Sequence, residues 1–261
     1  MEKNLAWHDA IGNRTSRHTY SKEDISPNQI KAIHQIISKI NEESGLNFQL
    51  LEDSTQFFAG FKMSYGLLKN VKTTVALVGD KSKVANIKSQ IGYYGEFLML
   101  ECVNLELGTC WIGGTYDKEG TENALNLGPH EELFAVITVG LVSETKTLKE
   151  KMISQFGKNK QTFDELLTEK EEPLPSWVRK GIEAARFAPS AVNGKPVAYT
   201  YLNKTVRAFT TKKNHNHEAI DLGISLAHFE LGALSEGIAG EWIPQSVSNS
   251  EEKIDFIFKT H

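Results

Sequence analysis

A long helix with apolar residues on more than one face is the feature of this sequence that most constrains its fold. The segment Ile91–Leu107 has the residue pattern of a helix, but its apolar side chains cover more than one face. A helix at a protein surface carries one apolar stripe, whereas a helix that is apolar on several faces is buried. We therefore expect a central helix packed on more than one side, which ends at Gly108 as its C-terminal cap.

The same pattern returns later in the chain. Residues His217–Glu236 predict a second long apolar helix, which ends at Gly237, and a strand rich in aliphatic or aromatic residues follows each helix. The residues before the two stops are also alike, LECVNLELG and FELGALSEG. Because buried helices share composition, this pattern alone leaves duplication and chance about equally open.

The remaining elements alternate between helices and strands. Ser26 and Pro27 predict the start of a helix over Asn28–Ile40 with one isoleucine-rich face. Other helices are expected at Trp7–Gly12 and from Ser176, as N-cap, to about Ala188. The expected strands cover residues 47–51, 71–79, 133–142, 198–202, 206–210 and 253–259. The charged segment 143–175 predicts a helix-bearing connector.

Composition excludes several classes of protein. The chain has 261 residues, 40% hydrophobic and 24% charged, which is ordinary for a globular protein of one or two domains. A net charge of −4 provides no general basic field for nucleic acid. The N-terminus lacks the apolar core of a signal peptide, and no apolar run approaches the roughly 18–20 residues of a membrane span. We therefore expect a cytoplasmic protein.

The two cysteines indicate a reducing compartment. Cys102 and Cys110 lie eight residues apart, which is about 12 Å along a helix, whereas a disulfide requires Cα atoms within about 7 Å. No cysteine or histidine spacing is typical of zinc, so no metal site is expected. Cys110 is either a nucleophile or, more in keeping with a free cysteine, a small packing residue.

Three polar segments are candidates for ligand binding. After the first helix, the side chains of Arg14, Ser16, Arg17 and His18 would suit a phosphate group, because guanidinium forks and short donors match its oxygens. The alternative is a solvated basic loop. In GTCWIGG, residues 108–114, Gly113 and Gly114 would let a flat ligand approach the backbone closely. The alternative is an ordinary helix exit.

The third segment is APSAVNGKPV, residues 188–197. Its proline, asparagine and glycine residues predict a turn that exposes backbone groups. Ser190 and Asn193 could bond the polar edge of a ring, and the alternative is a plain surface turn.

Together, these segments resemble the nitroreductase superfamily. RTSRHTY (residues 14–20) is similar to its N-terminal Arg-x-Ser-x-Arg signature, GYYGEFLML (92–100) with LGTCWIGG (107–114) to its central helix and the segment that follows, and ARFAPSAVNGKPV (185–197) to its Pro-Ser-x-x-Asn loop. In the usual member the Pro-Ser loop follows soon after the first motif. Here it comes about 170 residues later, which resembles a subgroup that fuses two half-folds in one chain.

The resemblance implies an α+β, nitroreductase-like fold. Its two fused half-folds, expected over residues 1–170 and 171–261, would each hold a central buried helix and an antiparallel-type sheet. They would form an intramolecular pseudo-dimer, so we expect a monomer. The first half carries the Arg-x-Ser motif and the second the Pro-Ser loop, and neither motif recurs in the other half. One composite FMN site per chain is therefore expected.

The resemblance also implies the chemistry, which is hydride transfer from NADPH or NADH to FMN and then to a nitroaromatic, quinone or similar small acceptor. Because the flavin performs this chemistry, no dedicated catalytic residue is expected. The family's second signature arginine is His18 here, and its Gln and Trp are Lys195 and Val197. Arg17, Lys158 or Lys160 would supply the missing positive charge. The expected cofactor-binding residues are Arg14, Ser16, Arg17, His18, Trp111, Gly113, Gly114, Lys160, Pro189, Ser190, Ala191, Asn193 and Lys195.

Two other functions stay open on the sequence. The replacements at His18, Lys195 and Val197 favour a non-catalytic flavin- or small-ligand-binding protein with a degenerate nitroreductase fold. A Cys110-dependent enzyme is the other. The sequence carries no dinucleotide-binding fingerprint that would separate NADH from NADPH.

Overall fold

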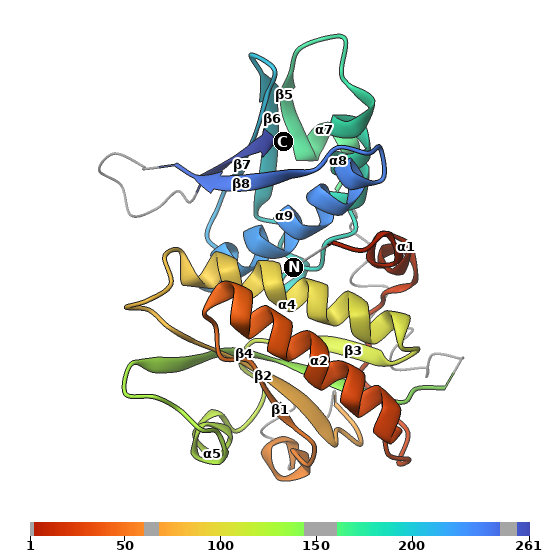
Figure 1. The fold of residues 1–261 in the computed structure, drawn as a ribbon, viewed down its shortest axis with the longest axis vertical. Coiled ribbons are helices and arrows are strands. Elements are labelled where there is room, and N and C mark those ends of the chain that lie inside the picture. The colour runs from red at the N-terminus through yellow and green to blue at the C-terminus, as the bar shows by residue number, and fades with distance from the viewer. Residues whose placement is uncertain (1–2, 60–67, 144–160, 246–254) are drawn as a thin grey trace. The chain divides into compact units, whose positions relative to one another are not determined.

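The computed structural model describes residues 3–59, 68–143, 161–245 and 255–261, and its elements are labelled in Figure 1. Within these residues the chain forms two compact units. The first takes in residues 13–87 and 97–143, and the second residues 3–12, 88–96 and those from 161 on. Helix α4 (Ile87–Asn104) contributes its first half to the second unit and its second half to the first.

The first unit is an antiparallel sheet covered by helices. Its four strands run in the order β1-β2-β4-β3, and Gln29 of α2 donates to the carbonyl oxygen of Leu105, just past the end of α4, at 2.8 Å. The other elements of this unit are α2 (Pro27–Ser44), β1 (Gln49–Leu51), η1 (Thr55–Phe58), β2 (Thr73–Asp80), β3 (Gly108–Ile112), α5 (Lys118–Ala124) and β4 (Glu131–Gly140).

The second unit has a five-stranded sheet in the order β5-β6-β7-β9-β8, in which β5 is parallel to β6 and the other pairs are antiparallel. Helix α9 packs on β6 and β7 and along α8. The elements are α1 (Leu5–Asn13), α7 (Phe163–Leu166), β5 (Leu167–Lys170), α8 (Ser176–Ala185), η2 (Ala191–Asn193), β6 (Val197–Leu202), β7 (Thr205–Thr210), α9 (Glu218–Leu234), β8 (Gly240–Pro244) and β9 (Asp255–Thr260).

The same connectivity occurs twice in the chain. Helix α2 is followed by β1, β2, α4, β3 and β4, and helix α8 by β6, β7, α9, β8 and β9. The sheet orders β1-β2-β4-β3 and β6-β7-β9-β8 correspond strand for strand, while β5 is an addition to the second sheet. This confirms the predicted pair of half-folds. The domain limits at residue 170 stay a prediction.

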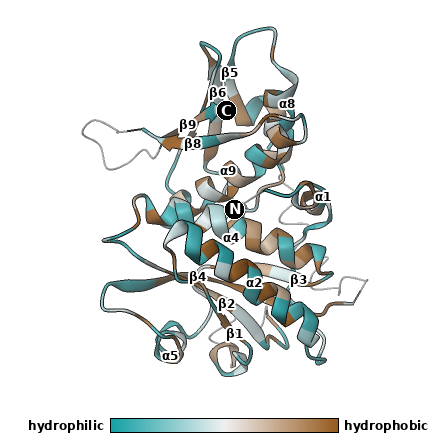
Figure 2. Ribbon diagram, viewed as in Figure 1, coloured by the Kyte–Doolittle hydropathy of each residue, from teal (hydrophilic) through white to brown (hydrophobic). Residues whose placement is uncertain are grey.

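Helix α2 shows how local sequence fixes an element of the first unit. The Ser26 and Gln29 side chains bond each other's backbone N–H groups in a capping box, which satisfies donors that the first helical turn leaves without partners. Four isoleucines on one face are buried, and Figure 2 shows the resulting mixture of brown and teal along the helix. Gly45 ends it with a φ of 69°, as the left-handed cap position requires.

Helix α9 is the centre of the second unit. Every residue from Ala219 to Ala233 is buried, as its all-round apolar pattern predicts. Gly223 faces α4, and a Cβ there would lie 1.9 Å from the Ser89 carbonyl oxygen. Gly92 on α4 faces back, with a Cβ position 2.0 Å from the Ile220 carbonyl oxygen. The two backbones therefore cross at a distance that only glycine allows on either helix.

A second pair of glycines lets α8 approach α9 from another side. A Cβ at Gly232 would lie 2.3 Å from the Lys180 carbonyl oxygen, and one at Gly181 would lie 2.5 Å from the Phe229 ring. Helices α4 and α8 therefore both contact α9 closely at glycine positions.

A buried polar contact links the same three helices. His228 on α9 donates from Nδ1 to the Ala184 carbonyl oxygen of α8 at 3.1 Å, and its Nε2 lies 2.9 Å from Oε1 of Glu96 on α4. Neither the His228 nor the Glu96 side chain is exposed. Since burying such groups is costly unless they are hydrogen-bonded, this contact also fixes how α9 is rotated against its neighbours.

The end of α4 differs from the sequence-based expectation. Gly108 does not cap the helix but begins β3, and the turn to it includes Glu106 with a φ of 63°. A Cβ at Gly108 would lie 2.3 Å from the Val142 side chain and 3.1 Å from Cγ of Arg17. Glycine is needed here for close packing, a requirement that looks the same in sequence as a cap.

Other differences are smaller. Pro175 occupies the N-cap position of α8, and Ser176 is its first residue. In the predicted connector, residues 144–160 lie outside the described part, and the rest contains α7 and β5. Strand β8 was not predicted, because GEWIP is a short edge strand that ends in a proline.

The cysteines and the helices also bear on the exclusions above. Neither Cys102 nor Cys110 takes part in a disulfide in the structure, and both are buried. Across the part of the chain that the structure describes, no helix combines the length and apolar character of a membrane span, and no cluster of potential metal ligands occurs.

The crossing of α4 and α9 predicts an unequal response of two glycines to alanine. Gly223→Ala should lower the free energy of unfolding by about 3 kcal/mol, because the new methyl group meets backbone that cannot give way. Gly12→Ala is the control, since a Cβ at this helical glycine meets nothing within 4 Å, and it should raise stability by up to about 1 kcal/mol. Thermal unfolding measures both. Equal midpoints for the two variants would contradict the close crossing.

Candidate functional site

The N-terminal motif lies along the edge strand of the first sheet. Ser16 pairs with Thr109 of β3 in a parallel bridge, and the Arg17 N–H donates to the Thr109 carbonyl oxygen at 2.9 Å. On the far side, the Lys69 N–H donates to the His18 carbonyl oxygen at 2.9 Å. The backbone of the motif is thus held on both sides.

Tyr20 anchors the end of this motif. Its hydroxyl donates to the Arg17 carbonyl oxygen at 3.0 Å and lies 2.7 Å from the Thr138 hydroxyl on β4. A Cβ at Gly140 would lie 2.7 Å from the Tyr20 ring. The ring therefore packs closely against the backbone of β4 at Gly140, and this contact secures the end of the motif.

The side chains of the motif have different environments. Ser16 is exposed and Arg14 is half-buried. Arg17 is only 8% exposed, and its Nη2 donates to the Ser143 carbonyl oxygen at 3.0 Å. His18 places Nε2 3.8 Å from the Cys110 sulfur. The Arg17 side chain is therefore hydrogen-bonded to the backbone at Ser143, and the Cys110 thiol lies next to the His18 imidazole.

Strand β3 brings further candidates next to the motif. Trp111 is half-buried near its end, and Gly113 and Gly114 follow as exposed residues. The Thr109 hydroxyl, at the bridge to Ser16, is buried and has no hydrogen-bond partner among the described residues. Such a hydroxyl costs about 1–3 kcal/mol when it is left unsatisfied. It is a donor that the sequence reasoning missed, and one that a ligand can satisfy.

In the second unit, the Pro-Ser segment forms a strained loop. Val192, Asn193 and Lys195 have φ values of 44°, 56° and 47°. A left-handed conformation costs an L-residue about 1–2 kcal/mol, and it is a genuine outlier for a β-branched residue such as valine. The Val192 side chain is 78% exposed, so burial of that side chain does not hold the conformation.

Two buried side chains hold this loop at Ala191. Asp221, in the first turn of α9, accepts the Ala191 N–H at 2.9 Å, and Asn214 donates to the Ala191 carbonyl oxygen at 2.9 Å. Asn214 also donates to the second Asp221 oxygen at 2.6 Å. Burial raises the pKa of Asp221 to about 6, although the hydrogen bonds from Asn214 and Ala191 act to lower it. Neither residue carries a local sequence signal, because each acts through a partner more than 20 residues away.

Lys195 folds back on its own loop. Its ammonium group donates to the Ala188 carbonyl oxygen at 2.7 Å, and its N–H donates to the Ser190 hydroxyl at 3.1 Å. The side chain is half-buried, so it does not simply point to solvent. Burial remains the main influence on the pKa of Asp221 and raises it, while the Lys195 charge acts in the opposite direction.

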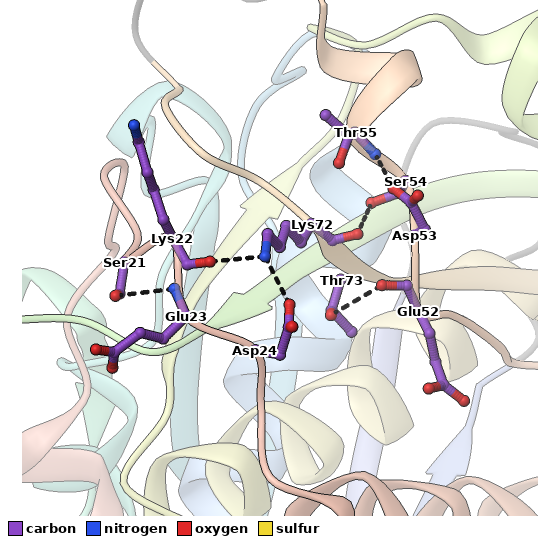
Figure 3. A network of polar contacts seen from close by, with 10 residues as sticks. All are labelled: Ser21, Lys22, Glu23, Asp24, Glu52, Asp53, Ser54, Thr55, Lys72 and Thr73. Carbon is purple, nitrogen blue, oxygen red and sulfur yellow. Dashed lines mark hydrogen bonds and ion pairs between the residues drawn. The ribbon is translucent and has the colours of Figure 1, made fainter.

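A separate pocket of about 110 Å³ lies in the first unit, beside Lys72. Figure 3 shows the polar network there, in which the Lys72 ammonium bonds the Lys22 carbonyl oxygen and Asp24, each at 2.6 Å. The Ser54 hydroxyl donates to the Lys72 carbonyl oxygen. This pocket is small beside the roughly 300–1,000 Å³ of a typical ligand site. Its residues tie the start of β2 to two neighbouring loops.

The predicted site residues thus fall into two groups. Arg14, Ser16, Arg17 and His18 lie with Trp111, Gly113 and Gly114 in the first unit, and Pro189, Ser190, Ala191, Asn193 and Lys195 lie in the second. Lys158 and Lys160 lie outside the described residues. The first group offers guanidinium, hydroxyl and imidazole donors that suit an anion, and the second offers a hydrogen-bonded loop with backbone and amide groups.

Comparisons with known proteins point to one family. A model of the family described as "Putative TM nitroreductase" matches residues 7–233. A structure described as a putative nitroreductase from Thermotoga maritima is 19% identical, with a TM-score of 0.61, and the match covers 99% of this chain and 94% of that one. This likeness shows the fold.

Two shorter structures are also similar. A putative NADH oxidase from Clostridium acetobutylicum is 22% identical, with 53% of this chain and 90% of that chain covered and a TM-score of 0.43. A nitroreductase with bound FMN from Bacteroides fragilis is 14% identical, with 56% and 92% covered and a TM-score of 0.44. No protein of curated function matches the sequence.

The anchoring of the motif by Tyr20 predicts a local effect of removing one hydroxyl. Tyr20→Phe should cost about 1–3 kcal/mol of stability and speed amide hydrogen exchange at Arg17. Tyr199→Phe is the control, because it removes a buried hydroxyl bonded to Ser225 in the second unit and should leave exchange at Arg17 unchanged. Unaltered exchange in Tyr20→Phe would show that the bridge to β3 holds the motif without the hydroxyl.

Proposed function

The chain belongs to the "Putative TM nitroreductase" family, and on this basis we propose that it is an FMN-dependent oxidoreductase. When bound, FMN supplies the hydride chemistry, which takes a hydride from NADPH or NADH and passes it to a nitroaromatic, quinone or similar small acceptor. The proposal rests on one observation. The Arg14–His18 motif lies along β3, next to the buried Thr109 hydroxyl, which has no hydrogen-bond partner among the described residues.

The residues of the first unit fit the phosphate and ribityl part of the cofactor. Arg14 would bind the phosphate through its guanidinium group, and the hydroxyl groups of Ser16 and Thr109 would donate to oxygens of the ribityl part. His18 would contribute an imidazole N–H where the family resemblance implies an arginine. Arg17 would add positive charge, although one of its nitrogens already bonds Ser143.

The remaining candidate residues would bind the ring, as the family resemblance implies. Gly113 and Gly114 would leave room for the ring edge beside Trp111, since neither glycine carries a side chain. The loop from Pro189 to Lys195 would contribute Ser190, Ala191, Asn193 and the charge of Lys195. Because each half carries one of the two motifs, we infer one composite FMN site per chain and no requirement for a partner subunit.

The residues of this site would bind and orient, and none of them is proposed as an acid or base. The donors around the flavin would tune its electronics, and Lys195 would stabilise negative charge on the ring.

The discriminating experiment is an absorbance scan of the purified protein with added FMN, followed by NADPH or NADH without oxygen. Protein that binds FMN and bleaches supports the proposal. Binding without bleaching favours a non-catalytic flavin-binding protein, and absence of binding contradicts both.

The phosphate role of Arg14 makes a quantitative prediction. Arg14→Ala should weaken FMN binding about 10- to 100-fold, because it removes a charge-assisted hydrogen bond. Arg179→Ala is the control, since Arg179 is an exposed residue of α8 that lies over the Phe163 ring. Quenching of flavin fluorescence measures both dissociation constants. Equal constants for the two variants would remove Arg14 from the site.

One observation favours a second candidate function. The Cys110 sulfur lies 3.8 Å from Nε2 of His18, which is a thiol–imidazole contact of the kind that activates nucleophilic cysteines. Against it, Cys110 is only 4% exposed and its thiol also contacts the Trp111 carbonyl oxygen.

The flavin proposal predicts that Cys110→Ser retains reductase activity within about twofold, because flavin-borne chemistry needs no thiol. Cys102→Ser is the matched control, since Cys102 is fully buried in α4 and burial raises the pKa of its thiol to about 12. Turnover of NADPH or NADH with a quinone measures both. A selective loss of activity in Cys110→Ser would favour the cysteine-dependent enzyme.

A further inference from the structure

The loop from Ser190 to Lys195 is held in an unusual conformation by side chains outside it. Three of its residues are left-handed, and such strain persists only where the surroundings over-determine the backbone. Internal bonds contribute, because the Asn193 N–H donates to the Ser190 carbonyl oxygen and the Gly194 N–H to the Ala191 carbonyl oxygen. These close a tight turn, but they do not fix the turn to the rest of the unit.

Asp221 and Asn214 make that connection. Between them they bond both the N–H and the carbonyl group of Ala191, as a neighbouring strand in a sheet would. Asn214 also packs under the turn, since a Cβ at Gly194 would lie 2.3 Å from its side-chain oxygen. Asp221 and Asn214 are 3% and 5% exposed. The contact is therefore a buried clamp on one residue of the loop.

The charge on Asp221 does not stabilise the fold. Burial raises the pKa of this carboxyl above its ordinary value of 3.8 to about 6, Glu218 raises it further, and Lys195 lowers it. A raised pKa means that the folded chain binds the proton more tightly than the unfolded chain. The contribution of this group to stability is thus present at low pH and lost as pH rises through about 6. Near pH 7 the ionised group opposes folding, yet its two oxygens accept the Ala191 N–H and the Asn214 side-chain N–H.

We propose that Asp221 and Asn214 are positioning residues, which preset the Ser190–Lys195 loop in the conformation that binds the flavin. This inference rests on the proposed function, because it assigns the loop to the same cofactor. Neither residue need touch the ligand. Their contribution is to settle the loop before binding, so that less conformational freedom is lost when the ligand arrives.

Asp221→Asn separates positioning from stability. The Ala191 N–H and the Asn214 amide bond different oxygens of Asp221. An amide replaces one of these oxygens by an NH2 donor, so one of the two bonds is lost in either orientation. The substitution also removes a buried charge that opposes folding above pH 6. The variant should therefore melt no lower than the wild type at pH 7, while it binds FMN about tenfold more weakly.

Glu230→Gln is the matched control. Glu230 is a second buried carboxylate of α9 whose pKa is raised by burial, but its partners are Tyr93 and Lys3. This variant should bind FMN as the wild type does.

The pH profile of binding adds a readout that a general loss of structure would not give. Wild-type affinity should fall as pH drops through about 6, because protonation turns one Asp221 oxygen into a donor. The phosphate of FMN also titrates near pH 6, but it does so with every variant. The difference between the wild-type and Asp221→Asn profiles therefore isolates the carboxyl, and identical profiles would overturn the proposal.

Amide hydrogen exchange tests the clamp without any cofactor. In protein free of FMN, Asp221→Asn should speed exchange at Ala191 and Gly194, and Glu230→Gln should not. A wild-type chain that binds no FMN would overturn the proposed function and the flavin part of this inference. The exchange experiment would still decide whether the pair positions the loop, and unchanged exchange in Asp221→Asn would show that it does not.

Discussion

The close approach of two helices to α9 is the constraint on which the second unit depends. Gly223 meets the backbone of α4 and Gly232 that of α8, and Gly92 and Gly181 meet α9 in return. The contacts are made by backbone and rings rather than by long side chains, so they have little capacity to adjust. His228, bonded to both Glu96 and Ala184, fixes the rotation of α9. Its first turn then places Asp221 where it can bond the Ala191 backbone.

The doubled connectivity gives the two half-folds one plan and different tasks. In the first, the edge strand β3 takes up the N-terminal motif through backbone hydrogen bonds, and Tyr20 secures the motif to β4. In the second, the polar segment is a loop between α8 and β6, and buried side chains hold it at Ala191. The same scaffold thus presents one candidate binding segment by sheet extension and the other by a side-chain clamp.

These two kinds of support have different sensitivities. Backbone pairing to β3 depends on no particular side chain at Ser16 or Arg17, so residues of the motif can vary in chemistry while their positions are kept. A clamp built on Asp221 depends on the ionisation of one buried carboxyl. The two segments therefore differ from the nitroreductase pattern in different ways. In the first segment, His18 stands where the pattern has an arginine, so an imidazole replaces a guanidinium donor. In the second, the Lys195 ammonium bonds the Ala188 carbonyl oxygen, and its charge acts to lower the pKa of Asp221.

The sequence by itself determined the elements whose signals are local. The apolar pattern identified α4 and α9, Ser26 with Pro27 identified the start of α2, and the order of three motifs identified the family. Only the tertiary structure decided that Gly108 begins a strand, because a glycine that packs against Val142 looks the same in sequence as one that caps a helix. It alone decided that Cys110 meets His18 and that Asp221 and Asn214 hold Ala191. Such contacts join residues that are far apart in the chain, and no local periodicity or composition records them.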